Sequence, residues 1–160
     1  MSSRKKVIVR KFSRDWQSGY VEPQDFVREG RLELLDLTGK VSGIALREIK
    51  MVCFVRDFLT TDPANPERLV RRTFSARPRS AGIWIRLHFR DGDQLEGIAS
   101  NDLTLLDPDG IQLTPPDTRS NTQRVFVPRT ALEALQVVSV IGSGTRRKLD
   151  DAGQEHLFAS

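Results

Sequence analysis

The chain has 160 residues, 38% apolar and 29% charged, which is typical of one soluble globular domain or two very small ones. No apolar run approaches the roughly 20 residues of a membrane span, and the basic start lacks the apolar stretch of a signal peptide, so we expect a cytoplasmic protein. The single cysteine, Cys53, excludes a disulfide framework and a cysteine zinc site.

The charged residues form blocks of opposite sign, although the net charge is only +4. Residues 4–14 hold six basic groups and no acid, residues 68–90 hold seven arginines and no acid, and residues 91–117 hold seven acids and no Lys or Arg. Arg outnumbers Lys by 19 to 6, which favours planar recognition of phosphate or carboxylate. Such blocks can steer a charged partner, and they can equally neutralise one another across a subunit contact.

Alternating apolar and polar residues predict short β-strands along most of the chain. Residues 83–90 alternate throughout, and Asp91-Gly92 then favours a hairpin turn because a primed turn needs positive φ. Helix is scarce, with one short helix expected at residues 129–135. The other strands expected in this half of the chain are 94–100, 103–106, 111–113, 125–127 and 137–141.

The two halves of the chain repeat one another. The pattern Leu-x-Leu-Leu-Asp-x-x-Gly occurs at residues 32–39 and again at residues 103–110, and its flanks recur in the same order. We therefore predict two copies of one small unit. The matched flanks are 7–10 with 83–86, 19–20 with 97–98, 45–47 with 127–129, and 52–55 with 137–141.

Five short strands in about 60 residues cannot bury both faces of a flat sheet, so we expect each copy to close into a small barrel. The expected fold is all-β, with two tandem five-stranded barrels and little helix. The expected domains are a first barrel at residues 4–58, an Arg-rich linker at 59–80, a second barrel at 81–142 and a mobile tail at 143–160.

The second copy resembles the Sm-like small barrels. Residues 89–98, Phe-Arg-Asp-Gly-Asp-Gln-Leu-Glu-Gly-Ile, are similar to the first Sm motif. Residues 125–132, Val-Phe-Val-Pro-Arg-Thr-Ala-Leu, look like the second motif. The first copy is more distant, with an insertion at residues 22–30. The resemblance suggests a bacterial family of tandem Sm-like barrels and leaves the function open.

Sm-like proteins, among them the bacterial RNA chaperone Hfq, form rings in which the fourth strand of one barrel pairs with the fifth strand of the next. They bind single-stranded RNA at loops that line the pore. The resemblance therefore implies a homo-oligomer with loop contacts to single-stranded RNA. The loop residues that it assigns here are Asn101 and Asp102, Pro128 and Arg129, and Arg47, the counterpart of Arg129 in the first copy.

The linker contains a second candidate contact with RNA. Arginines interleaved with one aromatic residue suit a groove that follows a nucleic-acid backbone and stacks a base. A solvated basic linker that lies against the acidic block would have the same composition. Arg71-Arg72 followed by Arg77 is also similar to the arginine motif of PilZ domains, which bind cyclic di-GMP. The candidate linker residues are Arg68, Arg71, Arg72, Phe74, Arg77 and Arg79.

Trp84 alternates with inward-facing residues, so we expect it to face outward and cover a contact between barrels. No residues have the spacing of a metal set, a catalytic motif or a phosphate loop, so we expect no enzyme activity, metal or cofactor. The function expected first is a regulatory protein that self-associates and binds single-stranded RNA. The alternative is a protein-interaction or scaffolding module that self-associates without nucleic acid, and the third is a cyclic-dinucleotide receptor.

Overall fold

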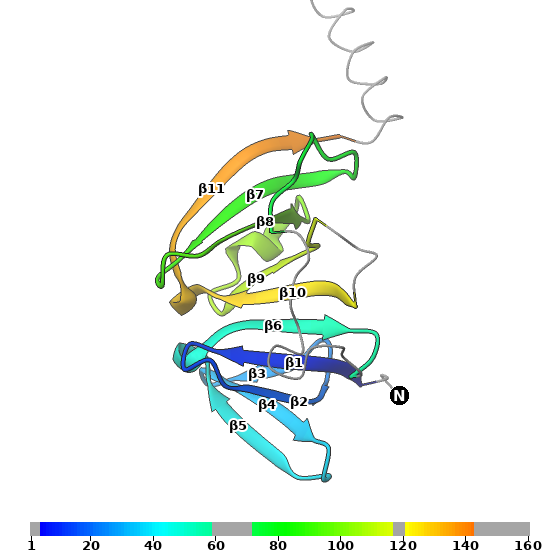
Figure 1. The fold of residues 1–160 in the computed structure, drawn as a ribbon, viewed down its shortest axis with the longest axis vertical. Helices are drawn as coiled ribbons and strands as arrows, with labels where there is room; N and C mark the ends of the chain where they lie inside the picture. Colours follow the sequence, from blue (N-terminus) through cyan, green and yellow to red (C-terminus); the bar gives the residue numbers. More distant parts are fainter. Residues whose placement is uncertain (1–3, 59–71, 117–120, 143–160) are drawn as a thin grey trace, which may run out of the picture.

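The computed structural model describes residues 4–58, 72–116 and 121–142 (Figure 1). The protein is all-β, as the sequence predicts. The first unit contains β1 (Lys5–Lys11), β2 (Trp16–Val21), β3 (Val27–Arg28), β4 (Arg31–Asp36), β5 (Val41–Ala45), the 3₁₀ helix η1 (Leu46–Glu48) and β6 (Ile49–Val55). The second unit contains β7 (Gly82–Phe89), β8 (Gln94–Ala99), η2 (Leu103–Leu106), β9 (Gly110–Leu113), β10 (Thr122–Pro128), η3 (Arg129–Ala131) and β11 (Leu132–Ile141).

The two units have the same order of antiparallel strands. In the first unit the order is β5-β4-β2-β1-β6, with the two-residue strand β3 also paired to β4. In the second unit it is β10-β9-β8-β7-β11, where β8 and β9 meet through a bridge between Ile98 and Thr114. In both units a 3₁₀ helix leads into the last strand, which pairs with the first.

One glycine at the same place in each unit allows two strands to approach closely. A Cβ atom on Gly19 of β2 would lie 2.6 Å from the carbonyl oxygen of Leu35, and one on Gly97 of β8 would lie 2.8 Å from the carbonyl oxygen of Thr114. Real Cβ atoms do not approach backbone oxygens so closely. Glycine is therefore required at both positions.

Strand β6 joins the two units. It pairs with β1 on one side and with β10 on the other, which makes one eight-stranded sheet from strands of both units. Val52 of β6 belongs to the first core, where Phe126 of β10 packs edge-on against Phe26 with ring centroids 5.0 Å apart. Met51 and Cys53 belong to the second core. The alternation of β6 thus supplies apolar side chains to both cores.

The remaining strands form a three-stranded sheet in the order β11-β7-β8. Within the described residues neither sheet closes into a barrel. The last strand of the first unit, β6, pairs with β10 of the other unit instead of β5, and β8 meets β9 through a single bridge. The sequence pattern gives the strands and their alternation, but it does not indicate which strand lies beside β6.

Two local predictions are wrong. The strand predicted at residues 103–106 is the 3₁₀ helix η2, whose N-cap Asp102 accepts a hydrogen bond from the amide of Thr104 at 2.9 Å. The helix predicted at residues 129–135 is limited to η3, because the chain from Leu132 onward is a strand paired with β7. From Leu132 onward, strand pairing with β7 determines the outcome, and this pairing is not visible in a local pattern.

Candidate functional site: the seam and the open sheet edges

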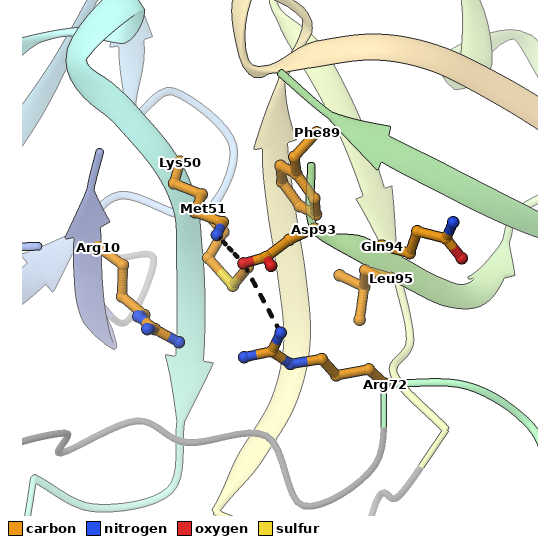
Figure 2. A pocket seen from close by; sticks show the side chains of 8 residues that line it. All are labelled: Arg10, Lys50, Met51, Arg72, Phe89, Asp93, Gln94 and Leu95. Atoms are coloured by element: carbon orange, nitrogen blue, oxygen red, sulfur yellow. Dashed lines mark hydrogen bonds and ion pairs between the residues drawn. The ribbon is translucent and has the colours of Figure 1, made fainter. Parts of the chain in front are cut away.

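Lys50 connects the two units near the start of β6. Its ammonium donates hydrogen bonds to the carboxylates of Asp91, at 2.6 Å, and of Asp93, both in the turn between β7 and β8. Arg72 forms a longer ion pair with Asp93, at 3.6 Å (Figure 2). The Lys50 ammonium also lies 5.3 Å from the centroid of the Phe89 ring. We call the contact between the units, formed by β6 and β10, the seam. Ion pairs and a cation–π contact therefore stabilise it in addition to strand pairing.

The pocket beside this cluster has room for about one water molecule. Partial burial opposes the ionisation of Asp91, but hydrogen bonds from Lys50 and from the Asp93 amide outweigh it and lower the pKa of Asp91. Lys50 and Arg72, which line the pocket, both pair with carboxylates (Figure 2). The ion pairs of Lys50 with Asp91 and Asp93 therefore connect the first unit to the second.

The two 3₁₀ helices that carry Arg47 and Arg129 lie side by side (Figure 1). The Thr130 hydroxyl of η3 donates to the Leu46 carbonyl of η1 at 3.3 Å. Arg47 is exposed, and its carbonyl accepts a hydrogen bond from Arg90 at 2.7 Å. The structure thus brings together Arg47 and Arg129, two of the residues that the sequence assigns to RNA-binding loops.

Arg129 has a structural role in this region. Its guanidinium donates hydrogen bonds to the carbonyls of Leu105 and Asp107, at the end of η2. Another predicted loop residue, Asn101, is exposed in the turn before η2. Of Arg47, Arg129 and Asn101, it is Arg129 whose side chain forms hydrogen bonds with backbone carbonyls of the protein.

The described end of the linker lies against β8. The Phe74 amide donates to the Glu96 carboxylate at 2.8 Å, and the Glu96 amide donates to the Arg72 carbonyl at 2.7 Å. The Phe74 ring packs edge-on against Trp84, with ring centroids 5.7 Å apart. Trp84 is half-buried on β7, whereas the seam between the units is formed by β6 and β10. Arg77 and Arg79 are exposed, and Arg68 and Arg71 lie outside the described residues.

Sequence reasoning missed the ion pair between the partly exposed Arg86 and the buried Glu96. The two residues are directly opposite each other in the β7–β8 hairpin, and the Arg86 Nε atom donates to the Glu96 carboxylate at 2.8 Å. Pairing outward from the predicted two-residue turn at Asp91-Gly92 would place Glu96 opposite Leu87, whereas the observed loop has three residues, 90–92, which shifts the register by one. This pair anchors the linker, because the same carboxylate accepts the hydrogen bond from Phe74.

The outermost strands, β5 and β11, each have one open edge. Among the described residues β5 pairs with β4 and β11 pairs with β7, and no strand covers the other edge of either. The ten-residue strand β11 exposes Leu135, Val137 and Val140, and β5 exposes Val41. Edge strands in soluble proteins are usually short or protected by charge, so these two edges are candidate interaction surfaces.

The chain belongs to the family of unknown function DUF6982, whose model matches residues 3–139. No curated protein and no solved structure matches the chain significantly. In the part of the chain that the structure describes, no helix is long and apolar enough to cross a membrane. The same residues contain no group of three or more His, Cys, Asp or Glu side chains arranged to hold a metal ion.

Proposed function

We propose that the chain is a non-enzymatic interaction module that self-associates through the open edges of its sheets without requiring nucleic acid. The observation that carries this proposal is the pairing of β6 with β10, which joins two similar units edge to edge within one chain. The strands β5 and β11 present apolar side chains along edges that no described strand covers. Such an edge is a template for pairing with another strand.

We also propose that each unit is an Sm-like small barrel in a strongly bent, incompletely hydrogen-bonded form. The support is the strand order of the two units: β1 lies between β2 and β6, and β7 lies between β8 and β11. A 3₁₀ helix joins the last two strands of each unit, as expected where the fourth strand of an Sm-like barrel turns into the fifth. This extends the resemblance of the sequence motifs to the arrangement of the strands.

Size-exclusion chromatography with light scattering tests self-association directly. We expect the nuclease-treated chain to run as a defined oligomer at low and at high salt. Val137→Lys should reduce the mass to that of a monomer, because a charge on an edge strand opposes pairing. Leu103→Lys is the matched control, since Leu103 is apolar and exposed but lies on η2, away from both edges. A wild-type chain that is monomeric at every concentration would exclude the proposal.

Single-stranded RNA binding is a second candidate, favoured by the adjacency of η1 and η3 and the exposed Arg47. It is tested by fluorescence anisotropy with labelled U-rich and A-rich RNA at two salt concentrations. RNA binding predicts an affinity that falls steeply with salt and is weakened by Arg47→Gln. Arg31→Gln, which removes an exposed arginine from β4, is the control. Absence of binding at low salt would exclude this candidate and leave the interaction module.

A further inference from the structure

We propose that residues 146–149, Arg-Arg-Lys-Leu, dock on the exposed face of η2 in the same chain. This face is formed by Leu103 and Leu106, and the exposed Asp102 and Asp107 stand on either side of it in the chain. It is separate from the open edges of β5 and β11, so the inference goes beyond the proposed self-association. Apolar contact and charge pairing would both contribute to the docking.

The exposed face of η2 consists of two leucines. Leu103 is 81% and Leu106 is 74% exposed, which makes them the most exposed large apolar side chains in the described part of the chain. Residues three apart in a 3₁₀ helix lie on the same side, so the two side chains form one apolar surface. Leu105, between them, packs against the core of the second unit instead. Because apolar surface is unfavourable in water, we expect a partner to cover this face.

Hydrogen bonds hold η2 in a fixed conformation. At its start, the Asp102 carboxylate accepts hydrogen bonds from the amide of Thr104, at 2.9 Å, and from its hydroxyl. At its end, the guanidinium of Arg129 donates to the carbonyls of Leu105 and Asp107. The two exposed leucines are therefore presented on a preorganised surface, and only a small loss of conformational entropy in η2 would oppose binding to it.

The charges around this surface favour a basic partner. Asp102 and Asp107 are exposed at the two ends of η2, and Asp109 follows two residues later. None of the ion pairs found among the described residues involves these three carboxylates. A segment that covers the leucines should therefore combine an apolar side chain with Lys or Arg.

Residues 146–149 have this combination, because three consecutive cations are followed directly by Leu149. They belong to the segment 143–160, which the sequence predicts to be a mobile tail and which lies outside the described residues. The three cations can pair with the aspartates around η2 while Leu149 contacts the two exposed leucines.

The segment begins close to η2, because β8 and β11 end on the same side of the three-stranded sheet (Figure 1). Val140 of β11 lies opposite Ile83 of β7, which in turn lies opposite Ala99 of β8. Neighbouring strands are about 4.8 Å apart, so Val140 and Ala99 are separated by about 10 Å. Leu103 follows Ala99 by four residues and is therefore at most about 24 Å from Val140. The nine residues from Val140 to Leu149 span up to about 30 Å, which is enough to reach Leu103 within one chain.

Limited trypsin digestion of the full chain, followed by mass spectrometry, tests the docking. Docking shields the cleavage sites at residues 146–148, so the wild type should be cut there at least about tenfold more slowly than Leu103→Ser/Leu106→Ser, which lacks the apolar surface. Leu37→Ser is the matched control, since Leu37 is 61% exposed but lies in the first unit. Cleavage after the exposed Arg79 is the internal reference and should be equal in all three chains. Circular dichroism checks that the fold is retained.

Dilution shows which chain supplies the docked segment. Docking within one chain should give a protection from trypsin that does not change with protein concentration. Protection that disappears on dilution would mean that the segment comes from a second copy, and equal cleavage of the wild type and Leu103→Ser/Leu106→Ser would mean that it does not cover η2. Either result overturns the inference, and neither bears on self-association through β5 and β11.

Disulfide formation tests the position of Leu149. A Leu103→Cys/Leu149→Cys chain should form its intramolecular disulfide at least about tenfold faster than Val137→Cys/Leu149→Cys, because docking raises the effective concentration of the first pair of thiols. Val137 is exposed on β11 and lies within reach of a segment that does not dock. The native Cys53 is buried. Equal rates in the two chains would overturn the inference.

The same reaction tests the charge pairing. Arg146→Gln/Arg147→Gln/Lys148→Gln, added to the Leu103→Cys/Leu149→Cys chain, should slow disulfide formation by about three- to tenfold, since exposed ion pairs are individually weak but three are lost together. An unchanged rate would contradict the pairing of these cations with the aspartates around η2.

Discussion

Arg86 and Glu96 face each other across the β7–β8 hairpin, and the guanidinium of Arg86 donates to the carboxylate of Glu96 at 2.8 Å. Glu96 is only 2% exposed, and its carboxylate also accepts a hydrogen bond from the amide of Phe74, 2.8 Å away. The carboxylate therefore holds the hairpin and the described end of the linker together.

Replacing Glu96 should weaken the fold because a buried acceptor for two donors is lost. We expect Glu96→Gln to lower the free energy of unfolding by about 1–3 kcal/mol, because the amide cannot replace the charge that pairs with Arg86. Chemical denaturation followed by circular dichroism measures the change. The control is Glu48→Gln, at an exposed position, which should alter stability by no more than about 0.5 kcal/mol. Equal effects of the two variants would contradict the structural role of Glu96.

Local sequence patterns predict the hairpin around Asp91-Gly92 correctly, but not the type of its turn. Gly92 has a φ of 95°, whereas Asp91 lacks the positive φ of a primed turn, and the Phe89 amide bonds to the Asp93 carbonyl, so the loop has three residues, 90–92. The alternation of the strands is equally local, because neighbouring side chains in a strand point to opposite faces. These features follow from residues close together in the chain, which is why the sequence is sufficient to predict them.

The leucine motif shows where sequence reasoning fails. Leu32 and Leu34 of the first motif are buried in β4, whereas their counterparts lie on η2, where Leu103 is exposed and Leu105 is partly buried. The two motifs are therefore not structurally equivalent, although the two units are. The seam between β6 and β10 was missed as well, because its formation depends on pairing between residues far apart in the chain, which no local pattern records.

The paired glycines give a second prediction. Gly97→Ala should destabilise the fold by about 1–3 kcal/mol, since the new Cβ would press against the side chain of Leu113 in β9 and the backbone carbonyl of the following Thr114. Gly43→Ala is the control, because Gly43 has no positive φ and its nearest neighbour would lie 3.5 Å from the Cβ. Thermal unfolding of both variants measures the difference. Similar melting temperatures would show that β8 and β9 can move apart without cost.

The lowered pKa of Asp91 predicts a dependence of stability on pH. The pKa of the Asp91 carboxyl is lower in the folded protein than in the unfolded chain. The contribution of this carboxylate to the free energy of unfolding is therefore fully present above the unfolded pKa of about 4, and it disappears as the pH falls through the lower folded pKa. Asp91→Asn should therefore have a lower melting temperature than the wild type at neutral pH, and this difference in melting temperature should become smaller in acid. Melting curves across this range provide the measurement. If the difference in melting temperature stays the same at every pH, the ion pair with Lys50 is not its cause.

Arg129 and Arg47 were assigned the same role from the sequence, and the structure predicts that they differ. Arg129→Gln should lower the free energy of unfolding by about 1–2 kcal/mol, because the carbonyls of Leu105 and Asp107 lose a charged donor. Arg47→Gln removes an exposed side chain and should change stability by about 0.5 kcal/mol or less. Urea denaturation of the two variants compares them without any ligand present. If both are as stable as the wild type, Arg129 does not support η2, and its side chain is available for a partner.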